Sequence, residues 1–357
     1  MFVAVRDLKF AKGRFALMGG VVALITLLVV LLSGLTAGLA RENTSAILGL
    51  PGDEMVFAAP AEGQSLAFSE SLIPDGAAQR WQDTPGVSDV QPLQIQTSRL
   101  TVGERSATVA AFAVPTGSTL APEEVPDGQV LLPEAVAGDL DLVAGDEVSI
   151  GGETMQVGAV SGDDAYSHMP VAWLPGALPA DGGQQHADTA TVLVLDTEGL
   201  TDADREATDS AAGTETVPLA DSVQALPSFS SENGSLQLMR GLLLVISALV
   251  IGAFFTVWTV QRTPEIAVLK AVGASTRYLV KDAVGQALVL LLLGTVLGAG
   301  VATGLGVLAA GVVPFVLDAA TVLVPMGLLI VLGLLGAAVS LRQIVSVDPL
   351  TALGSAR

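Results

Sequence analysis

Long apolar stretches interrupt this chain at four places, near Phe15–Ala40, Leu236–Val260, Leu279–Val313 and Thr321–Leu341. A helix needs about 20 predominantly apolar residues to cross the roughly 30 Å hydrocarbon core of a bilayer. Each stretch is long enough, so the pattern predicts four transmembrane helices. A long and mostly polar segment separates the first stretch from the second. This segment predicts one large soluble domain inserted between two transmembrane helices.

Short alternating stretches within the polar segment are typical of half-buried strands, as in Leu93–Gln94–Ile95–Gln96. Gly151–Gly152 predicts a tight hairpin turn between two further strands. The predicted strands lie near Val90–Leu100, Ser106–Val114, Asp146–Val160 and Thr189–Leu195, and the predicted short helices near Asp75–Asp83 and Pro133–Ala137. The inserted domain is therefore expected to be α+β.

Charge is distributed unevenly and predicts the orientation. Residues 41–240 contain 31 acidic and 6 basic side chains, whereas the whole chain carries a net charge of −20. Basic residues favour the cytoplasmic side of a membrane, and they flank the predicted helices at the N-terminus, between the second and third helices, and at the C-terminus. We therefore expect a multi-pass plasma-membrane protein with both termini cytoplasmic. The acidic domain between helices 1 and 2 is then extracellular and does not bind nucleic acid.

These patterns divide the chain into seven segments. Residues 1–49 are the cytoplasmic N-terminus and transmembrane helix 1, residues 50–230 the extracellular domain, and residues 231–260 transmembrane helix 2. Residues 261–278 form a cytoplasmic link, residues 279–313 transmembrane helix 3, and residues 314–320 a short extracellular loop. Residues 321–357 are transmembrane helix 4 and the cytoplasmic C-terminus.

Several kinds of chemistry are excluded by composition. The chain has no cysteine and two histidines, His168 and His186, so zinc–thiolate and iron–sulfur sites are impossible. It contains no G-x-x-x-x-G-K-[ST] sequence for cradling phosphates. We expect neither an intrinsic cofactor nor a catalytic residue in this chain.

The link between helices 2 and 3 predicts a short amphipathic helix. Pro264 suits a first helical turn, with Thr263 as its cap and Glu265 at its positive end. Ile266, Leu269 and Val272 share one face, and Gly273 can end the helix. Such a helix either rests at the lipid interface or docks on a partner.

Residues 262–275 read Arg-Thr-Pro-Glu-Ile-Ala-Val-Leu-Lys-Ala-Val-Gly-Ala-Ser. They closely resemble the R-x-x-E-I-A-x-L-K-A-[LIV]-G-A-S element of ABC transporter permeases of the MacB/FtsX type. Val347–Leu353 resembles the C-terminal V-D-P-x-x-A-L of that family, and Gly138–Val148 resembles the L-x-x-G-D-x-V of its periplasmic domain. The resemblance covers nearly the whole chain and is greatest to haem-exporting, HrtB-like permeases.

The resemblance implies a homodimeric permease working with two copies of a cytoplasmic ABC ATPase, and exporting haem from the membrane. The short helix would be the coupling helix, and its contacts with the ATPase would include Thr263, Glu265, Leu269, Lys270 and Gly273. The alternative is a mechanotransmitting permease of the same family, which exports another amphipathic or lipid-like cargo or activates an extracellular partner.

A haem site needs an apolar slot, a cation near the propionates and an axial ligand for iron. At the outer ends of helices 1 and 2, Arg41 and Arg240 are candidates for the propionates, and Glu42, Glu232 or Met239 for the iron. The same residues could instead anchor the helices at the interface. Tyr166 and His168 form a second candidate. Phe254, Phe255 and Trp258 could line a slot or contact lipid.

Two G-x-x-x-G spacings suit close helix packing, although glycine-rich spans also produce this spacing by chance. By resemblance, Gly34 and Gly38 are assigned to the dimer contact. Gly294 and Gly298 are then left for packing within one chain.

Overall fold

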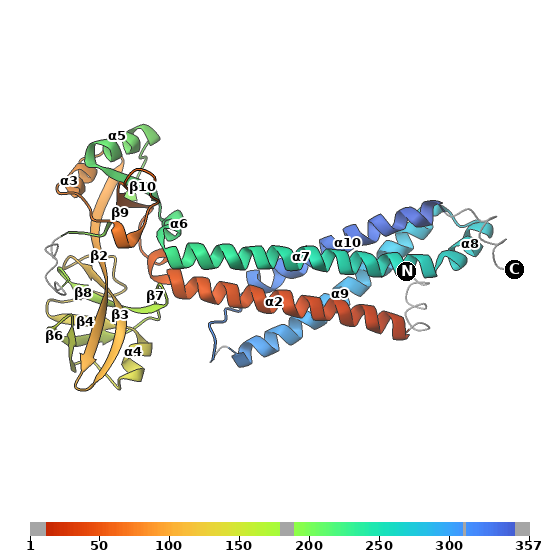
Figure 1. The fold of residues 1–357 in the computed structure, drawn as a ribbon, viewed down its shortest axis with the longest axis horizontal. Helices are drawn as coiled ribbons and strands as arrows, with labels where there is room; N and C mark the ends of the chain where they lie inside the picture. Colours follow the sequence, from red (N-terminus) through yellow and green to blue (C-terminus); the bar gives the residue numbers. More distant parts are fainter. Residues whose placement is uncertain (1–11, 179–188, 310–311, 347–357) are drawn as a thin grey trace. The chain divides into compact units, whose positions relative to one another are not determined.

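The computed structural model describes residues 12–178, 189–309 and 312–346, and these form two compact units. A helical unit comprises residues up to Gly38 and from Gly234 onward, and an inserted unit comprises Leu39–Asn233 (Figure 1). The predicted cytoplasmic ends, 1–11 and 347–357, lie outside the described residues, and so do His186 and the Val347–Leu353 motif.

Four helices in the described part of the chain are long and apolar enough to cross a membrane. They are α2 (Lys12–Leu48), α7 (Pro227–Gln261), α9 (Thr276–Ala309) and α10 (Ala319–Ser346). A short helix, α8 (Thr263–Ala271), joins α7 to α9. Helix α7 begins before the predicted residues 231–260, because the chain is already helical from Pro227.

Glycines let the helices of this unit approach closely. A Cβ atom on Gly298 of α9 would collide with the carbonyl oxygen of Ala23 in α2, and one on Gly294 would lie 2.8 Å from the Cβ of Val22. Helices α7 and α10 approach in the same way, because a Cβ on Gly336 would lie 3.0 Å from the Cα of Gly252. Close backbone approach strengthens dispersion contacts between helices in lipid. Gly294 and Gly298 therefore pack within the chain, as predicted.

The loop between α9 and α10 packs against Gly34 and Gly38 of α2. The ring of Phe315 occupies the space beside Gly34, and the carbonyl of Pro314 occupies the space beside Gly38. The Val316 amide also donates to the Gly34 carbonyl at 3.1 Å. Within one chain, Phe315 and Pro314 therefore fill the space beside these two glycines, and their assignment to a dimer contact stays a prediction. Their close approach occurs within the chain.

Helix α10 starts with a reciprocal cap. Asp318 accepts a hydrogen bond from the Thr321 amide, and the Thr321 hydroxyl accepts one from the Asp318 amide at 3.0 Å. These bonds satisfy backbone donors at the end of a helix. The hydrogen bonds from Thr321 lower the pKa of Asp318, because they favour the carboxylate form.

The described residues of the inserted unit form ten strands in one connected set of pairings, in the order β10-β1-β9-β2-β3-β8-β4-β6-β5, with β7 beside β8. The strands are β1 (Glu54–Ala58), β2 (Val87–Val102), β3 (Arg105–Val114), β4 (Gln129–Leu132), β5 (Glu147–Ile150), β6 (Glu153–Val160), β7 (Ala165–Tyr166), β8 (Met169–Pro175), β9 (Val192–Thr197) and β10 (Thr214–Pro218).

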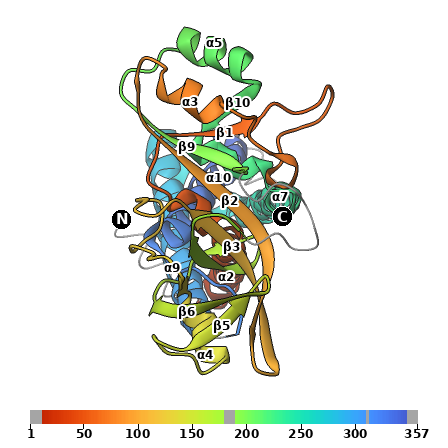
Figure 2. The same ribbon diagram turned by 90° about the vertical axis from the view of Figure 1, so that its left-hand side faces the viewer.

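Strand β2 joins two parts of the unit, and Figure 2 shows it running from β9 toward β5. Its first half pairs with β9, and its second half pairs with β3. Leu100 and Thr101 of β2 also pair with β5, so β2, β3, β8, β4, β6 and β5 close into a ring. The ring encloses a core that includes Leu100, Leu132, Ile150 and Leu174.

Four short helices complete the unit: α3 (Ala77–Gln82), α4 (Glu134–Asp139), α5 (Asp202–Ala212) and α6 (Leu219–Ser222). Trp81 of α3 and Ala212 of α5 pack against Val56 of β1 and Leu193 of β9. Arg205 of α5 binds the nearly buried Glu54 of β1, with Nε 2.9 Å from Oε2. This hydrogen-bonded partner raises the pKa of Arg205 further. The inserted unit is α+β, as predicted.

Candidate functional site

Helix α8 and its neighbours form the first candidate site, and its capping differs from the expectation. Arg262, not Thr263, is the N-cap residue, and it makes no side-chain capping bond. The Thr263 hydroxyl instead donates to the Thr259 carbonyl at 3.3 Å. The chain therefore passes from α7 into α8 through Arg262, with Pro264 in the first turn as predicted.

The other end of α8 closes as the sequence predicts. Gly273 has φ of +102°, a conformation that glycine adopts without a steric penalty. Its amide donates to the Lys270 carbonyl at 3.0 Å, and the Ala274 amide donates to the Leu269 carbonyl at 2.9 Å. These bonds satisfy carbonyl groups at the end of the helix. They turn the chain sharply from α8 toward α9.

The apolar face of α8 is only partly buried. Ile266 and Ala267 are buried against the helical unit, whereas Leu269 is 41% exposed and Val272 83% exposed. Glu265 is exposed and Gly273 has open space around it. The residues predicted to contact an ATPase therefore include several that are accessible on α8: Glu265, Leu269 and Gly273, with Thr263 and Lys270 half-buried.

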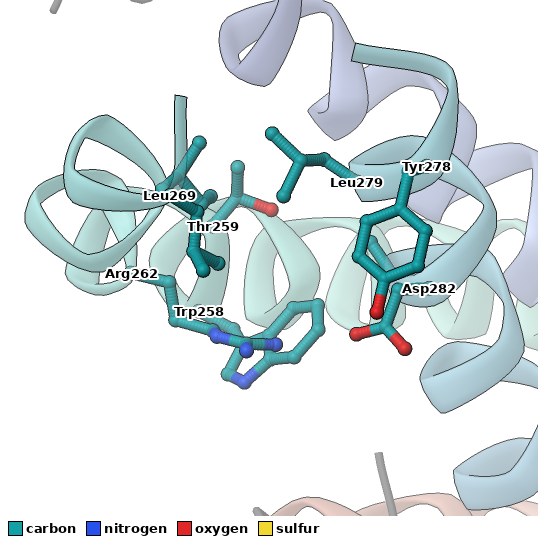
Figure 3. Close-up of a pocket in the computed structure, with 9 residues that line it drawn as sticks. Trp258, Thr259, Arg262, Leu269, Tyr278, Leu279 and Asp282 are labelled. Atoms are coloured by element: carbon teal, nitrogen blue, oxygen red, sulfur yellow. The ribbon is translucent and has the colours of Figure 1, made fainter. Parts of the chain in front are cut away.

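Arg262 contacts residues of three helices, α7, α8 and α9. Its Nη1 donates to Gln286 Oε1 of α9 at 2.6 Å, and its Nε donates to Glu265 Oε2 at 3.3 Å. Its guanidinium carbon lies 4.9 Å from the centre of the Trp258 ring of α7. A cavity of about 60 Å³ adjoins these groups, and Figure 3 shows Tyr278 and Asp282 on its α9 side.

The second candidate site lies in the inserted unit, where His168 stands between two carboxylates. His168 Nδ1 is 3.4 Å from Glu42 Oε2, and Nε2 is 3.1 Å from Glu232 Oε2. Asn43, which is buried, lies 2.9 Å from His168 Nε2 and donates to Glu232 at 3.1 Å. Ser228 donates to Asn43 Oδ1 at 2.9 Å. This set of residues is called the His168 cluster below.

A two-residue turn places the imidazole. Tyr166 of β7 pairs with Met169 of β8, so Ser167 and His168 form the hairpin loop. Their φ angles are +50° and +63°, the pattern of a type I′ turn. The backbone amides of both turn residues donate to α2, Ser167 to the Asn43 carbonyl and His168 to the Glu42 carbonyl, each at 3.0 Å.

The cluster does not have the geometry of a site that holds a bare metal ion through three protein ligands. Glu42 and Glu232 lie on different ring nitrogens of His168, and no group of three metal-ligating side chains converges among the described residues. The side chains of His168, Glu42 and Glu232 are 34% to 47% exposed, so solvent reaches both carboxylates although each contacts His168.

The structure brings together only some of the predicted haem residues. Glu42, Glu232 and His168 meet, and Arg41 is exposed beside them on α2. Met239, 48% exposed, and Arg240 lie farther along α7 in the helical unit. Tyr166 packs edge-on against Phe68 and Phe112, and burial raises its pKa. It belongs to the core of the inserted unit.

The aromatic residues of α7 have two roles. Phe255 and Trp258 are buried between helices. Phe254 and Trp258 also line an open groove of about 360 Å³ between α2 and α7, together with Gly13, Leu17, Met18, Val257 and Gln261. The groove is lined mainly by apolar side chains, which suits a lipid-phase ligand.

Sequence reasoning used Arg262 only as a marker of the cytoplasmic side and the start of the coupling motif, and it assigned no site role to Asn43, Ser228, Gln286 or Asp282. For Gln286 a signal existed, because a polar residue inside an apolar span is by default a functional candidate. Asn43 and Ser228 gave none, since their partners are distant in sequence.

Comparison with known proteins shows which family of permeases this chain resembles. Residues 238–349 match the FtsX-like permease C-terminal family. This C-terminal part of the chain is therefore similar to an FtsX-like permease domain, and the described residues include four helices long and apolar enough to cross a membrane.

Similar proteins extend the match over the full length. A protein of Staphylococcus epidermidis, provisionally assigned as the hemin transport system permease HrtB, is 24% identical over 361 residues, covering 99% of both chains. An uncharacterized ABC transporter permease of Mycobacterium tuberculosis is 28% identical over 370 residues, again covering 99% of both.

Solved structures show weaker similarity to part of the chain. The periplasmic region of MacB from Actinobacillus actinomycetemcomitans has a TM-score of 0.35 at 13% identity, covering 50% of this chain and 94% of that one. The extracellular domain of the ABC-type transporter YknZ from Gram-positive bacteria has a TM-score of 0.33 at 12% identity, covering 46% and 98%.

Proposed function

We propose that this chain is the permease subunit of an ABC efflux transporter that exports haem from the membrane. The observation that carries the proposal is full-length similarity to permeases named for hemin transport. The permease acts as a homodimer in lipid, and ATP with Mg binds to its two ATPase subunits. The chain itself supplies no catalytic residue.

The orientation follows from charge. Arg262, Lys270, Arg277 and Lys281 surround α8 and the start of α9, and basic residues favour the cytoplasmic side. Helix α8 then faces the ATPase, and the acidic inserted unit is extracellular. Glu265, Leu269 and Gly273 provide the accessible part of the ATPase contact, with Thr263 and Lys270 at its edge.

The His168 cluster is the proposed site where the iron of haem is held. An imidazole nitrogen and carboxylate oxygens can both ligate iron, and Arg41 offers a cation for a propionate. Glu42 and Glu232 are hydrogen-bonded to His168, so a ligand has to displace one of these bonds. That competition favours release, which an exporter needs. Met239 and Arg240 on α7 remain separate candidates.

A hemin titration of the detergent-purified permease, followed by the Soret band, tests this proposal. We expect saturable binding in the natural chain and loss of at least about tenfold in affinity in Glu42→Ala, Glu232→Ala or His168→Ala. Met239→Ala tests the candidate on α7, and Met18→Leu tests the groove between α2 and α7. Asn233→Ala, on α7 near Glu232, is the control.

The outcomes separate the candidates. If only the variants of the His168 cluster lose hemin affinity, the result supports this cluster as the haem site. If only Met18→Leu loses hemin affinity, the haem site is the groove between α2 and α7. A folded permease without saturable binding contradicts haem as the cargo. The second function of the class then stands: a mechanotransmitting permease that moves another amphipathic cargo or activates an extracellular partner.

A further inference from the structure

Arg262 occupies an unusual position for a basic residue at the end of an apolar helix. Its side chain is only 14% exposed, although basic side chains at such a boundary normally extend into water. Burying a guanidinium is unfavourable unless its donors are paired. Here Gln286 and Glu265 accept from it and the Trp258 ring stacks below it.

The partner on α9 is itself fixed. Gln286 is 1% exposed, and its amide nitrogen donates to Asp282 Oδ2 at 2.8 Å, one helical turn earlier. This bond sets the amide so that its oxygen faces Arg262. A continuous chain of hydrogen bonds therefore runs from Glu265 on α8 through Arg262 to Gln286 and Asp282 on α9.

Ile266 of α8 also packs with Leu279 and Ala283 of α9 in one buried apolar cluster, but a cavity interrupts this contact. The cavity of about 60 Å³ lies between them, lined by Ile266, Leu269, Leu279 and Ala283 among others. Packed cores lose dispersion contacts at such a gap. The apolar contact between α8 and α9 is therefore incomplete, and the hydrogen bond from Arg262 to Gln286 adds a polar contact between them.

We propose that Arg262 is the positioning residue that makes α8 move together with α9 and the end of α7. This inference rests on the proposed function, in which the ATPase displaces α8. A planar guanidinium can donate in two directions while stacking on an indole, and a lysine ammonium cannot do all three. The coupling of α8 to α9 therefore depends on the planar geometry of the guanidinium as well as on its positive charge.

The test uses the complex of the permease with its ATPase subunit, reconstituted in lipid. Spin labels are placed on exposed positions of α8 and α9 through Val268→Cys and Leu293→Cys, since the natural chain has no cysteine. The distance between labels is measured with and without a non-hydrolysable ATP analogue. Hemin-stimulated ATP hydrolysis is measured on the unlabelled complexes.

We expect an unchanged label distance in the parent, because α8 and α9 move as one body. Arg262→Lys and Gln286→Leu should show a distance that shifts or broadens when the analogue binds. Both should still bind the ATPase but lose hemin stimulation on the order of tenfold. The double variant should lose no more hemin stimulation than either single variant, because both substitutions remove the same hydrogen bond. Arg277→Lys, an exposed position on α9, is the matched control.

Two results would overturn the inference. One is a parent-like label distance and stimulation in Arg262→Lys. The other is loss of folding or ATPase binding in Arg262→Lys while Gln286→Leu behaves as the parent, which would make Arg262 a residue of general stability. If hemin does not stimulate ATP hydrolysis by the parent complex, the proposed cargo is contradicted instead. The distances between the labels are measured without hemin, so they still decide the role of Arg262.

Discussion

At the scale of single residues, Asn43 holds the His168 cluster in place. It is 1% exposed and contacts His168, Glu232 and Ser228 through its side-chain amide. An amide is suited to this position because it donates and accepts at once. Without it, Ser228 and Glu232 each lose a partner in a partly dry environment.

Asn43→Ala should therefore lower the free energy of unfolding by about 1–3 kcal/mol, the usual penalty for leaving buried polar groups unsatisfied. Thermal unfolding of the purified permease measures the change. Asn233→Ala, an asparagine on the partly exposed start of α7, should change stability by less than about 0.5 kcal/mol. Equal effects of the two substitutions would contradict the assigned role of Asn43.

Glu265 is a residue where function and stability should separate. It accepts one hydrogen bond from Arg262 and is 62% exposed. An exposed ion pair contributes only about 0–1 kcal/mol. Glu265→Lys should leave stability nearly unchanged and abolish stimulation of the ATPase, because it reverses charge on the accessible face of α8. Glu265→Gln is the milder control, and normal stimulation in Glu265→Lys would remove α8 from the interface.

At the scale of elements, the contact between α9 and α2 depends on one side of α9. A methyl group added at Gly298 would meet the Ala23 carbonyl, whereas one added at Gly300 would have nothing within 4 Å. The two glycines lie on the same helix and differ only in what they face. They form a natural pair for testing how tightly the helices pack.

Gly298→Ala should destabilise the helical unit by about 1–3 kcal/mol, since the added methyl group has to push two backbones apart. Gly300→Ala should be neutral or slightly stabilising, because alanine favours helix more than glycine does. Thermal unfolding in matched detergent compares them. A neutral Gly298→Ala would mean that α2 and α9 are not in backbone contact.

At the scale of the whole molecule, the side of the membrane on which each region lies is a prediction that chemistry can check. Val143 in the inserted unit is 64% exposed and Val268 on α8 is 51% exposed. The natural chain has no cysteine, so a single engineered thiol is unambiguous. Val143→Cys should react with a membrane-impermeant maleimide on intact cells, and Val268→Cys only after permeabilisation. The reverse pattern would invert the proposed orientation.

The sequence predicts the elements of this molecule better than their contacts. Length and hydropathy are local properties, so the four spans and the Gly151–Gly152 hairpin can be recognised directly. The pairing of β2 with β5 cannot, because it joins Leu100 to Ile150 across two other strands of the chain. The turn at Gly273 is predictable, whereas the predicted capping role of Thr263 is wrong.

The candidate site shows the same limit. Glu42 and Glu232 can be identified because charged residues at helix ends are conspicuous in the sequence. Their meeting with His168 cannot, because the imidazole reaches them across 126 and 64 residues of chain. Gly34 and Gly38 are recognisable as packing positions, but a spacing of glycines does not say what packs there. The partners are Phe315 and Pro314 of the same chain.

The hairpin loop Ser167–His168 has a consequence for protein engineering. Type I′ turns are best served by Asn-Gly, since both central residues need positive φ. Here a serine and a histidine hold that conformation instead. A redesign for stability alone would write Asn-Gly at these positions and would erase the imidazole. Under the proposed function, the natural sequence keeps a less favourable turn and with it the imidazole proposed to contact haem.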